Sequence, residues 1–129
     1  THPLSTKMYV GDTSPLYAGA SSKTLLAFMP NAEEYVNNIT LEPIADQTIL
    51  SKEQLLQELQ QIRSQRYAKS SSERVRGACS VTAPILNAAQ QIIASVTIVI
   101  PEVRYNDYDE QQLIEMIQQV AVEIEKQLY

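Results

Sequence analysis

The sequence is poor in glycine, cysteine and histidine, and each shortage excludes a kind of chemistry. Its 129 residues include only 3 Gly, 1 Cys and 1 His. No glycine lies near another, so the chain has no glycine-rich loop for a phosphate. One Cys and one His cannot supply the four ligands of a structural zinc site. Nucleophilic catalysis needs a base beside the nucleophile, and His2 stands at the chain end. We therefore expect no enzyme, no metal site and no cofactor.

Long apolar runs and an internal disulfide are absent as well. The most apolar stretch, residues 92–100, is interrupted by Ser95 and Thr97, and it is shorter than the roughly 20 residues of a membrane-spanning helix. Residues 1–10 lack the apolar centre of a signal peptide. Cys79 has no second cysteine to pair with, which suits a reducing compartment. We expect a cytoplasmic protein that does not enter a membrane.

Positive charge is also scarce. The 10 Lys and Arg are outnumbered by 15 Asp and Glu, which gives a formal net charge of −5. An acidic domain repels the phosphate backbone, and the chain has no basic cluster that could follow one. By itself it should not bind nucleic acid. Its 44% hydrophobic and 19% charged residues are instead typical of one globular domain.

Capping residues and apolar spacing predict two short helices in the first part of the chain. Ser21 or Ser22 can cap the first, which Pro30 ends. Asn31 can cap the second, with Glu34 as its partner in a capping box.

Two longer helices carry apolar stripes. Residues 51–54 (SKEQ) form a capping box for a helix that ends near Arg66, with an apolar stripe of Leu55, Leu59 and Ile62. The last helix should begin at Asp107, with Glu110 as its capping partner. Its predicted buried face consists of Leu113, Ile117, Val120, Ile124 and Leu128. Core or subunit packing explains both stripes.

Segments rich in Val, Ile and Thr predict the strands. They lie at residues 4–10, 67–70, 80–86 and 91–100. The last two should form an antiparallel hairpin around residues 87–90. Helices combined with such strands indicate an α+β fold, in which one antiparallel sheet is flanked by helices.

The hairpin register decides which side chains share a face. With a tight turn at residues 87–90, Ser80 lies opposite Thr97, and likewise Thr82 lies opposite Ser95. One face then carries these four hydroxyls, and the other is wholly apolar: Val81, Ala83, Ile85, Ile92, Ala94, Val96 and Ile98. A one-residue slip would destroy this separation. The hydroxyls can face solvent, or they can floor a small polar pocket because they both donate and accept.

Two further groups of serines could contact a ligand. Ser21 and Ser22 stand at a predicted helix start, where unpaired N–H groups favour a carboxylate. Plain helix capping is the simpler explanation. Residues 70–72 (SSS) would by themselves indicate only a turn.

Three segments carry motifs of a known family, in order and with near-constant spacing. Residues 11–18 (GDTSPLYA) and 22–28 (SKTLLAF) are similar to G-x-x-x-P-L-(H/Y)-A … G-K-A-L-L-A-F. Residues 62–68 (IRSQRYA) are similar to V-R-x-x-G-Y-A. Residues 73–87 are similar to E-x-x-x-G-x-x-(C/S)-(I/V)-A-A-P-(V/I)-x-(D/N). Together they resemble the IclR family of bacterial transcription regulators, from about Leu4 to the end of the chain.

The resemblance implies a regulator of two domains. An N-terminal winged helix-turn-helix domain binds DNA, and a C-terminal GAF-like domain binds a small metabolite and forms dimers and tetramers. Residues 1–129 would be this effector-binding and oligomerisation domain, without its first helix and strand pair. We therefore expect a homodimer or homotetramer that contacts DNA only through a domain absent from this chain.

The resemblance also implies an effector pocket at the start of the first helix, the strand after Tyr67 and the hairpin. Position by position, the effector-binding residues would be Ala20, Ser21, Ser70, Ser80, Thr97 and Val99. Ser80 and Thr97 are hydroxyls that the simple register places face to face. This agreement favours a pocket floor over a solvent-facing surface.

The sequence departs from the family pattern at some of these positions. Ser70 stands where the family usually has Asp, and Val99 lacks a hydroxyl. Arg66 stands where Gly is usual, and Cys79 lies one position before the signature site, where it should only pack. The ligand, a small organic acid or a similarly oxygen-rich metabolite, can therefore differ from the two- or three-carbon keto acids of the best-known members.

Two other functions stay open. A ligand-free module that only holds subunits together would have a collapsed site between Ser80 and Thr97. A small hydrolase on a similar sheet would need a base that the sequence does not show.

Overall fold

A computed structural model describes residues 15–73 and 76–128 of the chain. Its helices are α1 (Ala20–Ala27), α2 (Ala32–Asn38), α3 (Lys52–Gln65), α4 (Glu102–Tyr105) and α5 (Glu110–Gln127). Its strands are β1 (Ala68–Ser71), β2 (Ala78–Leu86) and β3 (Ile92–Pro101). They form an antiparallel sheet in the order β1-β2-β3, which confirms the α+β prediction. The strand predicted at residues 4–10 lies outside the described residues.

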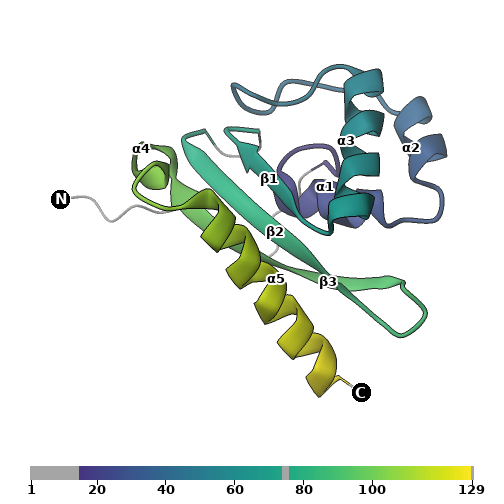
Figure 1. The fold of residues 1–129 in the computed structure, drawn as a ribbon. Coiled ribbons are helices and arrows are strands. Elements are labelled where there is room, and N and C mark those ends of the chain that lie inside the picture. The colour runs from purple at the N-terminus through teal and green to yellow at the C-terminus, as the bar shows by residue number, and fades with distance from the viewer. Residues whose placement is uncertain (1–14, 74–75, 129) are drawn as a thin grey trace.

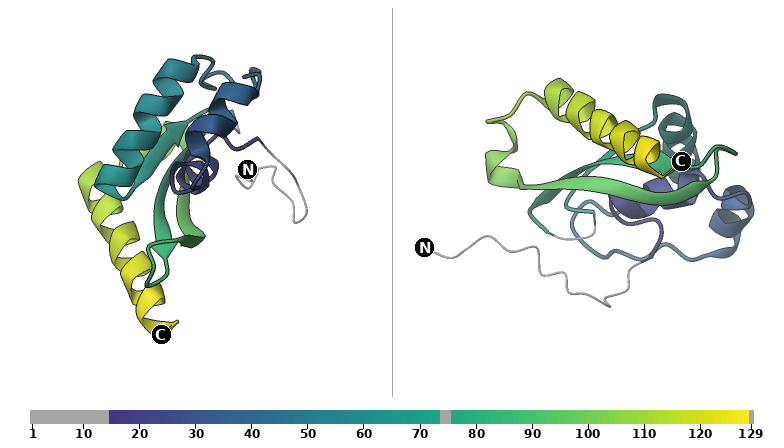
Figure 2. Two further views of the ribbon diagram at one scale, coloured as in Figure 1. Left: turned by 90° about the vertical axis from the view of Figure 1, so that its right-hand side faces the viewer. Right: turned by 90° about the horizontal axis from the view of Figure 1, so that it is seen from below.

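Helices lie on both faces of the sheet (Figure 1). α5 runs along one face and packs on β2 and β3, whereas α1 lies against the other face and contacts all three strands (Figure 2). α3 packs on α1, and α2 packs on α3. Within the described chain, no helix combines the length and the apolar character that crossing a bilayer requires.

The sheet separates two apolar cores. Val81, Ala83 and Ile85 are buried against α5, where they meet Ile114 and Ile117. The helices α1, α2 and α3 bury a second core among themselves and β1. Because each large aliphatic side chain contributes about 1.5–3 kcal/mol when it is buried, these two cores fix α5 and the α1–α3 group on either side of the sheet.

The helix α3 follows its prediction. Ser51 Oγ accepts a hydrogen bond from the N–H of Gln54 at 3.2 Å and caps the helix. The helix ends where Arg66 takes a left-handed conformation with φ 65°. The predicted apolar stripe is buried: Leu55, Leu59 and Ile62.

The starts of the two short helices differ from the prediction. Gly19 caps α1, and not Ser21 or Ser22. Its φ of 94° and ψ of 156° are accessible to glycine and rare for residues with a Cβ. α2 does begin after Asn31, but that side chain makes no capping hydrogen bond, because its φ of −113° and ψ of 31° are not the extended conformation of a side-chain cap. The predicted capping box with Glu34 is therefore wrong.

The cap of α5 lies two residues later than predicted. Asp109, rather than Asp107, is the cap, because its Oδ1 accepts hydrogen bonds from the N–H groups of Gln111 and Gln112. The preceding residues form α4, a single helical turn that the sequence did not reveal.

The buried face of α5 is also rotated from its predicted position. Val120 and Leu128 are exposed, whereas Ala121 is buried. Both Val120 and Ala121 fit helical spacing from Ile117, and the small Ala121 side chain lets the helix approach the sheet closely. The buried residues are Leu113, Ile114, Ile117 and Ala121.

The hairpin contains two extra residues that the tight-turn register does not include. Asn87 pairs with Gln91 across a three-residue loop, its N–H donating to Gln91 O at 2.9 Å. Gln90 takes φ 62° to close this loop. A bulge at Ile93 adds the second extra residue and places Ile92 opposite Leu86, on the face that carries the hydroxyls.

The two extra residues shift the register without exchanging the faces of the rest of the hairpin. Thr97 lies opposite Thr82, and Ser80 lies opposite Val99. The predicted pairs, Ser80 with Thr97 and Thr82 with Ser95, are therefore wrong. Because the shifts add to an even number, the hydroxyls still share one face.

Candidate functional site

Hydroxyl groups gather on the face of the sheet that α1 covers. Thr82 is wholly buried, and its Oγ1 lies 2.8 Å from that of Thr97. Next to this pair, Ser80 and Val99 lie opposite each other and are half-buried. Since opposed residues point to the same side of a sheet, these four side chains form one patch beneath the start of α1.

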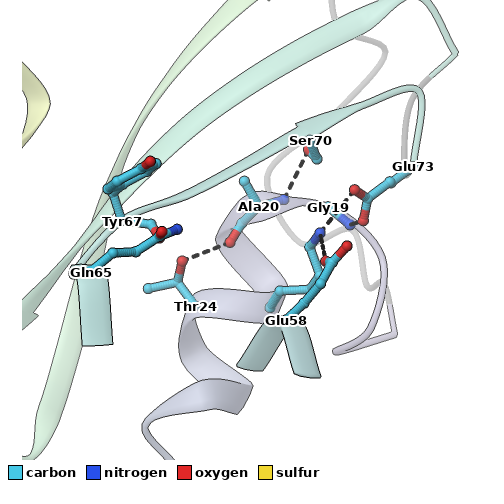
Figure 3. A network of polar contacts seen from close by, with 9 residues as sticks. Gly19, Ala20, Thr24, Glu58, Gln65, Tyr67, Ser70 and Glu73 are labelled. Carbon is cyan, nitrogen blue, oxygen red and sulfur yellow. Dashed lines mark hydrogen bonds and ion pairs between the residues drawn. The ribbon is translucent and has the colours of Figure 1, made fainter. Parts of the chain in front are cut away.

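Ser70 of β1 extends the patch, because it lies opposite Ser80. Its Oγ accepts a hydrogen bond from the N–H of Ala20 at 3.0 Å (Figure 3). A backbone N–H can only donate, so the Ser70 hydroxyl keeps its proton for another acceptor. Ser21 Oγ lies 3.3 Å from Ser95 Oγ on β3. The first turn of α1 is thus hydrogen-bonded to both edges of the described sheet.

All six predicted effector-binding residues lie on this side of the sheet. Ala20 is 1% exposed, and the others are half-buried: Ser21, Ser70, Ser80, Thr97 and Val99. Direct contacts join Ala20 to Ser70. The backbone ladder joins Ser70 to Ser80 and Ser80 to Val99.

A buried lysine under the start of α1 was missed in the sequence. Lys23 is 1% exposed, and its Nζ lies 2.8 Å from Glu58 Oε2 and 2.8 Å from Glu73 Oε2. The other oxygen of Glu73, Oε1, accepts a hydrogen bond from the N–H of Gly19 at 3.4 Å (Figure 3). Charges buried in this way need partners, because their transfer from water is costly.

The spacing of Lys23 could have revealed its burial. It stands three residues after Ala20 and four before Ala27, and both of these are buried. Its partners could not be found in the same way, because Glu58 and Glu73 are distant in sequence. Burial raises the pKa of Glu73 above its usual value, and the charge of Lys23 opposes this shift.

A cavity of about 470 Å³ touches the site at Ser70 and Glu73 but has its other walls elsewhere. One wall is Glu110, which accepts hydrogen bonds from Tyr105 Oη at 2.7 Å and Lys69 Nζ at 2.8 Å. Both bonds lower the pKa of Glu110, and the bond from Lys69 has the larger effect. Of the six predicted residues the cavity includes only Ser70, so it does not coincide with the predicted pocket.

Residues able to bind a metal are dispersed in the described ranges. There, no three His, Cys, Asp or Glu side chains are arranged to hold a metal ion. Cys79 is buried, and its Sγ lies 3.5 Å from Ser71 Oγ.

The chain is similar to known proteins over almost its whole length. Residues 1–126 match the family described as "bacterial transcriptional regulator IclR C-terminal". The HTH-type transcriptional regulator KipR of Bacillus subtilis is 32% identical over 121 residues, which are 92% of this chain and 48% of KipR. The chain spans about half the length of the curated relatives it matches.

Solved structures share the fold. The crystal structure of the C-terminal domain of Escherichia coli KdgR has a TM-score of 0.75 and 28% identity, over 88% of this chain and 71% of that one. The structure of an IclR homolog from Microbacterium hydrocarbonoxydans, complexed with 4-hydroxybenzoate, has a TM-score of 0.83 and 23% identity, over 95% of this chain and 50% of that one. At 23% identity, the second comparison shows a similarity of fold alone.

Proposed function

The chain belongs to the C-terminal domain family of IclR-type bacterial transcriptional regulators, and we propose that it is the effector-binding domain of such a regulator. Its ligand is a small organic acid or a similarly oxygen-rich metabolite. The domain assembles into a homodimer or homotetramer in the cytoplasm. Ligand binding modulates operator binding by a DNA-binding domain elsewhere in the regulator.

One observation carries this proposal, namely the gathering of hydroxyls at the start of α1. Ser21 lies in the first turn of α1, Ser70 Oγ accepts a hydrogen bond from Ala20 in that turn, and Ser80 lies opposite Ser70 in the sheet. A small ligand between α1 and the sheet would meet groups that both donate and accept hydrogen bonds. A fixed polar surface of this kind orients an oxygen-rich molecule.

The hydrogen-bond arrangement favours a ligand rich in acceptor oxygens. Ser70 already accepts from Ala20 and has its proton left to donate. The Ser80 hydroxyl makes no hydrogen bond with any residue that the structure describes. The helix dipole adds a partial positive charge at the start of α1. A carboxylate such as that of 4-hydroxybenzoate, found with the Microbacterium homolog, fits these donors.

The control of DNA binding follows from differential affinity. A ligand that binds one conformation of the assembly more tightly shifts the population toward it. By linkage, that shift changes operator affinity by the same coupling free energy.

Calorimetry on site variants tests the proposal, with a ligand chosen by a thermal-shift screen of small organic acids that begins with 4-hydroxybenzoate. Ser80→Ala should weaken binding by up to about tenfold, because a neutral hydrogen bond contributes about 0.5–1.5 kcal/mol. Ser80→Phe should fill the site and abolish binding while the chain stays folded. Ser64→Ala, on the exposed surface of α3, is the matched control and should bind as the parent does. Unchanged binding by Ser80→Phe would place the ligand elsewhere.

A second candidate is a module that assembles subunits and binds no ligand. The mutual hydrogen bonds of Thr82 with Thr97 and of Ser21 with Ser95 favour it, because they satisfy hydroxyls without a ligand. In that case no acid in the screen would raise the melting temperature. Sedimentation would still show oligomers.

A further inference from the structure

The start of α1 is capped by residues distant in sequence. Its own N-cap, Gly19, has no side chain, and its first turn carries no acidic residue. The acceptors lie instead in the segment around the end of β1: Ser70 Oγ accepts a hydrogen bond from the N–H of Ala20, and Glu73 Oε1 accepts one from the N–H of Gly19. The first turn of α1 therefore depends on a separate part of the chain for its cap.

Glu73 holds this turn at two points. One carboxylate oxygen accepts from the N–H of Gly19 at 3.4 Å, and the other lies 2.8 Å from Lys23 Nζ. Lys23 is one helical turn further on, where its own N–H donates to Gly19 O at 3.0 Å. Two attachments one turn apart restrict both the position and the rotation of the helix start.

Lys23 carries the connection on to α3. Its Nζ also lies 2.8 Å from Glu58 Oε2, and the exposed fractions of the three side chains are 2% for Lys23, 32% for Glu58 and 9% for Glu73. Removal of one partner from a buried ion pair is strongly destabilising, because the other charge is left buried and uncompensated. The more deeply buried carboxylate, Glu73, should therefore dominate the placement of α1.

We propose that Glu73 is a positioning residue for the ligand site, holding the first turn of α1 through Gly19 and Lys23 without touching a ligand. The role of that turn in ligand binding rests on the proposed function. The position of the turn does not depend on it, since Glu73 would hold Ala20 near Ser70 with or without a ligand. The role therefore has a test that needs no ligand.

The test is amide hydrogen exchange on the full chain, which reports local opening. Glu73→Ala and Glu58→Ala each remove one carboxylate from Lys23, but only the first removes the acceptor of Gly19. With β2 amides as the internal reference, Gly19 and Ala20 should exchange about tenfold faster in Glu73→Ala than in Glu58→Ala. Equal exchange in the two variants would overturn the proposal.

The conservative variant separates the hydrogen bond from the charge. Glu73→Gln keeps an oxygen for Gly19, so it should restore much of the protection at that amide, whereas a general loss of stability would not be rescued there. If Glu73→Ala does not fold, Glu73→Leu, which also lacks an acceptor for Gly19, takes its place and is compared with Glu58→Leu. Faster exchange at Gly19 in Glu73→Leu is then expected, and identical profiles in the two variants would overturn the proposal.

Binding of 4-hydroxybenzoate distinguishes this inference from the proposed function. If the parent binds it, Glu73→Ala should weaken affinity more than fivefold and Glu58→Ala less than about twofold. Equal weakening would count against positioning. If no organic acid binds the parent, the proposed function fails, and the exchange result still decides the role of Glu73.

Discussion

Thr82 Oγ1 and Thr97 Oγ1 lie 2.8 Å apart across the paired strands β2 and β3, and Thr82 is wholly buried. One hydroxyl donates and the other accepts, so each satisfies its neighbour. The pair therefore belongs to the structure of the sheet. The hydroxyls of Ser70 and Ser80, beside it, donate to no residue that the structure describes.

A double-mutant cycle checks the threonine pair. Thr97→Val should destabilise the chain by about 1–3 kcal/mol, because it leaves the buried Thr82 hydroxyl without a partner. Adding Thr82→Val should recover much of that loss, since two valines of similar shape replace both polar groups. Urea unfolding of the four proteins measures the coupling. Strictly additive losses would contradict it.

Replacement of the buried lysine should be far more damaging than replacement of an exposed one. Lys23→Met leaves Glu73 buried beside Glu58 without a cation, which should cost about 3–5 kcal/mol in free energy of unfolding. Lys69→Met is the control, because its ion pair with Glu110 is solvent-exposed and should contribute less than about 1 kcal/mol. Denaturant midpoints compare the two, and similar losses would refute the distinction.

Substitutions at Arg66 measure the cost of a left-handed backbone conformation in a residue that has a Cβ. Its φ of 65° is unfavourable by about 1 kcal/mol for any residue with a Cβ and is free of strain for glycine. Arg66→Gly should therefore be about 0.5–1 kcal/mol more stable than Arg66→Ala. Both variants lose the hydrogen bond from Arg66 to Gln90 Oε1, so their difference isolates the backbone. Equal thermal midpoints would disprove the strain.

The pH dependence of stability should have two opposite contributions. The pKa of Glu73 is raised in the fold, chiefly by burial, so its contribution is fully present below the unfolded value and is lost as the pH rises through the folded value. The pKa of Glu110 is lowered, chiefly by the hydrogen bond from Lys69, so its contribution is lost as the pH falls below about 4.5. The midpoints of urea unfolding between pH 3 and 7, a range of roughly two units around the usual pKa of a glutamate, measure both contributions. Glu73→Gln should remove only the first contribution, and Glu110→Gln only the second.

Local signals in the sequence predicted most of the fold. Ser51 and the stripe of α3 lie within a few residues of the groups they serve, so capping and spacing identify them. The register of the hairpin was missed because it depends on the left-handed Gln90 and the bulge at Ile93. Neither position has the glycine that usually marks such a feature.

The candidate site was predicted only in part, because its contacts join distant segments. Alternation along the strands predicted the face of the sheet on which Ser80 and Thr97 lie, but it did not predict the residues opposite them. The cap of α1 comes from Ser70, fifty residues from Ala20. Sequence spacing cannot relate such positions, so the partners of Lys23 were likewise out of reach.

Alternation along β2 also bears on how such a domain can diverge. Val81, Ala83 and Ile85 hold α5 in place, whereas Ser80 and Thr82 face α1. Substitution of Ser80 leaves both the α5 core and the hydrogen-bonded pair of Thr82 and Thr97 untouched, so it should have little effect on stability. Under the proposed function, changes on this face of a single strand alter which ligand is bound, while the core that holds α5 is inherited unchanged.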